Sequence, residues 1–145
     1  MSLTRKERRA GGFTLIELMI VLFILGLLAA LVAPRLMGRV GKAKQKVAQA
    51  QIQMLSTALD LFHLDVGRYP TEEEGLKALV QRPENLPQWS GPYLEKGVPK
   101  DPWGRDYIYK FPGEHGTYDL VSLGADGAPG GEGESADITN YQTPE

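Results

Sequence analysis

Residues 13–33 read FTLIELMIVLFILGLLAALVA, and this apolar run indicates which class of protein the 145-residue chain belongs to. Its only charged residue is Glu17. As an α-helix, these twenty-one residues reach about 31 Å, which matches the roughly 30 Å hydrocarbon core of a bilayer. Residues 1–12, MSLTRKERRAGG, precede the run as a short basic leader. The sequence therefore predicts a membrane-spanning helix behind a cationic N-terminus.

A secretory signal peptide shares this general plan of a basic start and an apolar core. Two details argue against one here: the apolar run is longer than a typical signal core, and Leu31-Val-Ala33-Pro34 is a poor small-x-small cleavage site. The positive-inside rule does not settle the orientation, because the far flank is as basic as the leader. The basic residues of that flank are Arg35, Arg39, Lys42, Lys44 and Lys46.

Glu17 is the unusual residue of the predicted span. A carboxylate at membrane depth costs roughly 2–3 kcal/mol, and less near the interface. One interpretation is a tolerated interfacial acid at the helix end. The other is a carboxylate that awaits a positive charge created on another copy of the protein. The residues alone leave both open.

The helix is predicted to continue beyond the span. Pro34 removes a backbone hydrogen bond and predicts a kink or a local unwinding. Apolar residues then recur at three- and four-residue spacing up to Gly67, which indicates an amphipathic helix packed on one side against a domain. This predicted stripe comprises Val40, Ala43, Val47, Ala50, Met54, Ala58, Phe62 and Val66, broadened by Leu55 and Leu59.

Residues 67–145 are predicted to form a turn-rich globular head, because they contain 12 Gly and 9 Pro. Thr71–Glu74 has the pattern of a capping box and predicts a short helix through about Arg82. Asp101–Gly104 predicts a tight turn. Short strands are expected over 106–111 and 117–123 and near Ile138.

The predicted fold class is α+β, a long N-terminal helix packed on a small antiparallel sheet. Four parts are expected: leader 1–12, membrane helix 13–33, amphipathic half-helix 34–66 and head 67–145. Residues 1–66 carry nine Lys and Arg against four Asp and Glu, a net charge of about +5, whereas residues 67–145 carry seven against fourteen, about −7. An acidic head argues against nucleic-acid binding by that part.

Composition also excludes most catalytic chemistry. The chain has no cysteine, which excludes disulfides, zinc–thiolate sites and thiol catalysis. Its two histidines, His63 and His115, are far apart in sequence, and no nucleophile-elbow or phosphate-loop pattern occurs. Trp89 and Tyr93 are expected to fill the core rather than to form a ligand cage. We therefore expect a non-enzymatic protein with no catalytic residues.

Gly12-Phe13-Thr14-Leu15-Ile16-Glu17 after a basic leader resembles the N-terminal signal of type IV pilins and pseudopilins. The resemblance implies that a prepilin peptidase cleaves after Gly12 and N-methylates Phe13. It also implies that the new amine pairs with Glu17 during packing of neighbouring subunits. The head motifs Tyr69-Pro-Thr, Asp101-Pro-Trp-Gly104 and Ser122-Leu-Gly-Ala-Asp-Gly127 resemble the major pseudopilins of type II secretion systems.

Residues 124–137, GADGAPGGEGESAD, form an acidic Gly-rich loop. Composition alone favours a solvated loop, although crowded oxygen donors are also what Ca²⁺ requires. The pseudopilin resemblance implies a structural Ca²⁺ here, held by the Leu123 carbonyl, Asp126 and Asp137. Ala136 stands where relatives often have a second acid, and Ser135 is the candidate for the missing oxygen.

The resemblance implies a structural subunit of a periplasmic filament that drives export of folded proteins. Its implied partners are other copies of the chain, the prepilin peptidase, minor pseudopilins and an inner-membrane assembly platform. The implied topology is a single inner-membrane span with the head in the periplasm. Two alternatives stay open: a type IV pilin for adhesion, motility or DNA uptake, and a membrane-tethered domain that binds a ligand and never polymerises.

Overall fold

The structure is a computed structural model that describes residues 11–141, so most of the predicted leader lies outside the described residues. Its elements are helix α1 (Leu15–Val66), the 3-10 helices η1 (Gly75–Leu79) and η2 (Gly133–Ser135), and strands β1 (Ile108–Lys110), β2 (Asp119–Ser122) and β3 (Ile138–Thr139). The chain divides into two compact units between Met37 and Gly38. Each unit is described by itself.

The first unit holds the apolar part of α1. Every described residue from Gly11 to Met37 is exposed within the chain, including the long apolar side chains. α1 contains a segment long and apolar enough to cross a membrane. The helix passes through Pro34 without a break, so the predicted local unwinding is wrong. Because no other part of residues 11–141 covers these side chains, they form an apolar surface that is costly to leave in water.

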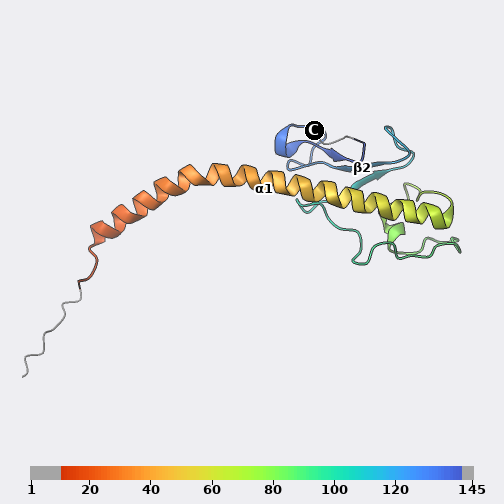
Figure 1. Cartoon of the computed structure of the whole chain (residues 1–145), viewed down its shortest axis with the longest axis horizontal. Coiled ribbons are helices and arrows are strands. Elements are labelled where there is room, and N and C mark those ends of the chain that lie inside the picture. Colours follow the sequence, from red (N-terminus) through yellow and green to blue (C-terminus); the bar gives the residue numbers. More distant parts are fainter. Residues whose placement is uncertain (1–10, 142–145) are drawn as a thin grey trace, which may run out of the picture. The chain divides into compact units, whose positions relative to one another are not determined.

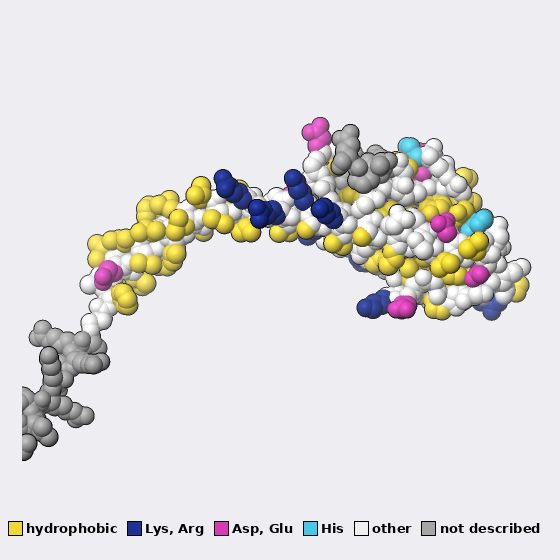
Figure 2. Space-filling view, viewed as in Figure 1, with side chains coloured by type: hydrophobic (Ala, Val, Ile, Leu, Met, Phe, Trp, Pro, Cys, Tyr) yellow, Lys and Arg dark blue, Asp and Glu magenta, His cyan; other side chains and the backbone are white. Residues whose placement is uncertain are grey.

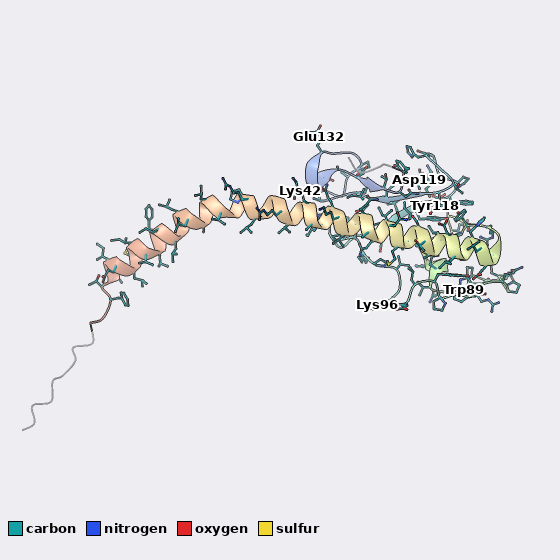
Figure 3. The ribbon with its side chains drawn as sticks, in the orientation of Figure 1. Lys42, Trp89, Lys96, Tyr118, Asp119 and Glu132 are labelled. Atoms are coloured by element: carbon teal, nitrogen blue, oxygen red, sulfur yellow. The ribbon has the colours of Figure 1, made fainter. Side chains whose placement is uncertain are left out.

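The second unit is built around residues 38–66 of α1. The sheet lies along one side of this half-helix, and the segment between η1 and β1 runs along the other side (Figure 1). Labelled side chains follow the same division, with Trp89 on one side of the helix and Asp119 on the other (Figure 3). Fully buried side chains from the helix and both flanks meet in one core, including Phe62, Leu59, Leu79 and Leu120.

The buried stripe of α1 differs in phase from the predicted one. Buried residues are Gly41, Ala48, Ile52, Leu55, Ala58, Leu59 and Phe62. The prediction was correct for the last four but wrong for Val40, Ala43, Val47, Ala50 and Met54, which are exposed. The physical reason is close approach: a Cβ on Gly41 would lie 1.9 Å from Cδ of Glu134. Gly41 and Ala48 are small, so the head can pack closely on the helix at this end of the stripe. The larger Val40 and Val47 face away from the head.

The sheet has the order β1-β2-β3 and both pairs are antiparallel. Tyr109 pairs with Leu120, and Ser122 pairs with Ile138. The predicted alternation holds in β1, where Tyr109 is buried and Ile108 is exposed. The three expected strands are therefore confirmed, although β1 and β2 are shorter than predicted.

The predicted capping box forms, but a long helix does not follow it. Thr71 N donates to Oε2 of Glu74 over 2.8 Å, and Glu74 N donates to Oγ1 of Thr71 over 3.2 Å. Gly75 then adopts φ +57°, in the left-handed region that favours glycine. This backbone turn interrupts the α-helix, so only the short η1 forms and the predicted extension to Arg82 is wrong.

The aromatic residues of the following loop pack against the core, as predicted. Tyr93 meets Phe62 edge-on with ring centroids 5.7 Å apart and donates from its hydroxyl to Asp65 over 2.8 Å. Trp89 packs on Tyr93 and donates from Nε1 to the carbonyl of Ala78 over 2.7 Å. These bonds satisfy the polar atom of each side chain, so both aromatic residues can sit against the core.

The first prediction concerns the buried face of α1 in the second unit. Leu59→Ala removes a fully buried side chain and leaves a cavity, so we expect a loss of about 2–5 kcal/mol in the free energy of unfolding. Leu64→Ala on the same helix is the matched control, because Leu64 is 76% exposed and the change should stay within about 0.5 kcal/mol. Urea unfolding of the full chain in detergent micelles measures both. Equal losses would contradict the assigned phase of the buried stripe.

The second prediction concerns pH. Arg68 donates twice to Glu74, over 2.7 and 2.8 Å, and this pairing lowers the pKa of Glu74 below its ordinary value. A lowered carboxyl pKa gives stability that is present above the unfolded-state value of 4.5 and is lost as the pH falls through the folded-state value. Glu74→Gln should cost about 1 kcal/mol at neutral pH, and the difference from the wild type should shrink below pH 4.5.

Thermal unfolding between pH 3 and 7 measures this difference, with Glu73→Gln as the exposed neighbouring control. A difference that stays constant across the range would contradict the ionic origin of the effect.

Candidate functional sites

The N-terminal site centres on Glu17 at the start of α1. Glu17 N donates to Oγ1 of Thr14 over 3.2 Å, and Thr14 N donates back to Oε2 of Glu17 over 3.1 Å. The hydroxyl of Thr14 donates to the same oxygen, also over 3.1 Å. This reciprocal pair is a capping box that satisfies backbone donors at the helix start. The carboxylate of Glu17 is thereby held beside the backbone of Thr14.

Sequence reasoning missed this capping box. The pattern Thr14-x-x-Glu17 before an apolar run was the signal that could have found it, as it did at Thr71. Gly12 and Phe13 lie just before the helix and are exposed, with Phe13 at 91%. The structure therefore places the predicted cleavage and methylation residues next to the cap that holds Glu17.

The second site is the acidic loop between β2 and β3. Its two ends lie side by side, because Ala125 N donates to the carbonyl of Glu134 over 3.0 Å. Gly124, at φ +65°, lies so close to Ser135 and Ala136 that a Cβ on it would be 2.7 Å from the Ala136 carbonyl. The fold thus brings the segment that carries Leu123 and Asp126 against the segment that carries Ser135 and Asp137.

Asp137 has an incomplete set of hydrogen bonds. Its Oδ2 accepts from Gly130 N over 2.9 Å, whereas Oδ1 is buried with no hydrogen-bond partner. It is the only such buried side-chain atom among residues 11–141. Asp126 is exposed and accepts from Ala128 N over 3.0 Å. A buried carboxylate oxygen without a donor is costly unless a cation or water meets it, so the loop suits a hard cation.

Within the same described range, no group of three or more His, Cys, Asp or Glu side chains could hold a metal. Any cation in the loop therefore needs backbone carbonyls or hydroxyls as further ligands, in line with the predicted Leu123 carbonyl and Ser135. Glu134 does not supply the missing acid, because its carboxyl group packs over Gly41 of α1. Glu132 projects outward from the loop (Figure 3).

The histidines have structural surroundings. His63 stacks on Tyr69 with ring centroids 4.5 Å apart. His115 stacks on Tyr141, and its Nδ1 lies 3.0 Å from Oδ2 of Asp119. Burial acts to raise the pKa of Asp119, but its hydrogen bonds from the His115 ring and from backbone amides outweigh burial and hold that pKa below the usual range. This arrangement stabilises the turn between β1 and β2.

Two surface features lie on residues 38–66 of α1. Basic side chains gather on the helix just after the apolar segment (Figure 2). Lys42 and Lys46 of residues 38–66 are exposed. The exposed apolar face consists of Val40, Ala43, Val47, Ala50, Met54, Leu61 and Leu64. At 100° per residue, the centre of this exposed apolar face lies about 130° around the helix from the centre of the buried stripe. The half-helix is therefore apolar on two faces, and the described part of the head, up to residue 141, covers one of them.

The family model described as "Type II secretion system (T2SS), protein G" matches residues 35–141, and the model described as "Prokaryotic N-terminal methylation motif" matches residues 8–33. The chain belongs to the type II secretion system protein G family. Curated relatives named type II secretion system core protein G share 49% identity in Vibrio cholerae and 48% in Pseudomonas aeruginosa. The first alignment covers 94% of this chain and 95% of the relative, and the second covers 94% and 98%.

A solved structure agrees with this assignment. The major pseudopilin from the type 2 secretion system of enterohaemorrhagic Escherichia coli is 38% identical, with a TM-score of 0.61. The match covers 74% of this chain and 95% of that one. The protein is thus a structural, non-enzymatic subunit of the type II secretion pseudopilus, and its long helix on a three-stranded antiparallel sheet is the pseudopilin fold. The adhesive-pilin and tethered-domain alternatives are set aside.

Proposed function

We propose that this subunit is inserted with its leader in the cytoplasm, cleaved after Gly12 by a prepilin peptidase and N-methylated at Phe13. The head then lies in the periplasm. The match of the methylation motif to residues 8–33 carries the proposal. The exposure of Gly12 and Phe13 supports it, because a peptidase needs an accessible bond ahead of the helix.

Glu17 is proposed to pair with the methylated amine of a neighbouring subunit. The capping box supports this role, because it holds the carboxylate at the membrane-facing helix start while only Oε2 accepts from Thr14. An amine on a second copy would supply the cationic partner that a carboxylate at membrane depth needs.

The subunits are proposed to pack through the helix in a homopolymer. Exposed apolar side chains are abundant along residues 15–37, and the second unit has its own exposed apolar face along residues 40–64. Surface that is apolar enough for lipid can also be buried against other helices. The remaining partners are proposed to be minor pseudopilins and the inner-membrane assembly platform.

The acidic loop is proposed to bind one structural Ca²⁺ through the Leu123 carbonyl, Asp126, Ser135 and Asp137. The buried, unpartnered Oδ1 of Asp137 supports this proposal, as does the contact between the two ends of the loop. When bound, the ion would tie the two ends together.

The third prediction separates the charge of Glu17 from its capping role. Glu17→Gln keeps a capping acceptor but removes the charge, whereas Thr14→Ala keeps the charge and removes the cap. Both variants should be processed to a chain that starts at methylated Phe13, read by intact mass. Glu17→Gln should lose filament assembly almost completely, and Thr14→Ala should reduce it only partly, as measured by crosslinking of membrane fractions.

Glu132→Gln, an exposed acid of the head, is the control for the loss of one carboxylate. Wild-type chains that start at residue 1 in cells with an active prepilin peptidase would contradict the processing proposal. Normal assembly of Glu17→Gln would contradict the pairing proposal.

The fourth prediction concerns metal removal. At a Ca²⁺ concentration 100-fold above Kd, binding adds about 2.7 kcal/mol of stability, so EGTA should lower the melting temperature by about 10 °C. Asp137→Asn should melt at the same temperature with and without Ca²⁺, while Glu132→Gln should keep the wild-type response. Scanning calorimetry of the full chain measures the shift. A wild-type melting temperature that EGTA leaves unchanged would refute the calcium proposal.

A further inference from the structure

Arg105 reaches across the head to the acidic loop from the turn that precedes β1. Its Nη1 donates to the carbonyl of Gly124 over 2.6 Å, and its Nη2 donates to the carbonyl of Ala125 over 3.1 Å. These two carbonyls lie between Leu123 and Asp126, the first two proposed Ca²⁺ ligands. One guanidinium thus fixes both peptide units of this turn.

The backbone of Arg105 is itself held by hydrogen bonds. Asp101 Oδ1 accepts from Arg105 N over 2.8 Å, and Asp101 N donates to the carbonyl of Arg105 over 2.8 Å. Asp101 is 4% exposed, and its Oδ2 accepts from Oγ of Ser122 in β2 over 2.7 Å. The guanidinium is therefore anchored to the sheet through a buried carboxylate whose two oxygens both accept hydrogen bonds.

The loop leaves room for the guanidinium. Gly127 lies against it, and a Cβ on Gly127 would be 2.6 Å from Cζ of Arg105. The backbone of Gly127 also has φ +69°, which favours glycine. The planar group fits against the turn, and a fork of two N–H donors matches two adjacent carbonyls better than one ammonium does.

We propose that Arg105 is a positioning residue for the calcium loop. It holds the Gly124 and Ala125 carbonyls, and so sets the orientation of the Leu123 carbonyl and of Asp126 before the ion arrives. The inference rests on the proposed calcium site. A loop that is already ordered loses less conformational freedom on binding, which raises affinity. An opposing effect exists, because a guanidinium repels a nearby divalent cation.

The two effects predict opposite results for Arg105→Gln. If positioning dominates, the variant binds Ca²⁺ at least about tenfold more weakly, the equivalent of one charged hydrogen bond. If repulsion dominates, it binds more tightly. Arg105→Lys keeps the charge but not the fork, so positioning predicts an intermediate affinity. Titration calorimetry with CaCl₂ on the full chain in micelles measures the Ca²⁺ affinity of the wild type, of Arg105→Gln and of Arg105→Lys.

Hydrogen exchange in EGTA gives a second readout that needs no metal. The amides of residues 124–137 should exchange faster in Arg105→Gln than in the wild type, while those of 48–62 in α1 should be unchanged if the variant is folded. Arg82→Gln is the matched control, because Arg82 donates to the Leu86 carbonyl elsewhere in the head.

The outcomes are separable. If Arg105→Gln binds Ca²⁺ as tightly as the wild type or more tightly, the positioning role of Arg105 is overturned. The calcium site itself is then still supported. A wild type that does not bind Ca²⁺ would overturn the calcium site itself, and the positioning role with it.

Discussion

Burial of one face of α1 by the head is the interaction on which the rest of this molecule depends. The strands are two to four residues long, and a sheet of that size cannot be stable alone. Leu55, Leu59 and Phe62 supply the apolar surface against which both the sheet and the Trp89 loop pack. The helix is therefore the centre of the core, and the head is wrapped on it.

A helix used in this way cannot also bury its other faces within one chain. The apolar side chains of residues 15–37, and the exposed apolar face from Val40 to Leu64, stay in contact with whatever surrounds the subunit. On the proposed function, residues 15–37 would lie first in lipid and then against other subunits, and the face from Val40 to Leu64 would meet other subunits. The same exposed surface is compatible with both, because lipid chains and leucine side chains are similar environments. The cost of exposing the side chains of residues 15–37 in water would favour these two states over a free subunit in water.

Features carried by local sequence could be predicted, and features decided by contact between distant residues could not. The Thr71–Glu74 cap and the Asp101–Gly104 turn follow from patterns a few residues long. The phase of the buried stripe depends on which face of α1 the head covers, and residues that pack there, such as Leu79, Leu120 and Glu134 over Gly41, are distant in sequence. Periodicity shows that a helix has an apolar face, but it cannot say which of two such faces the head covers.

The acidic loop shows the same division. Its composition alone favours a solvated loop, and only the resemblance to relatives implies a cation and names the types of ligand. Arg105 carries no such signal, because its partners are backbone carbonyls that any residue supplies. The head has no cysteine with which to close this loop, so non-covalent links must fix it. A guanidinium on one end and an ion between the two ends would act on different parts of the loop. On the two proposals, the guanidinium would order the turn, and a bound ion would draw Asp126 and Asp137 together by neutralising both.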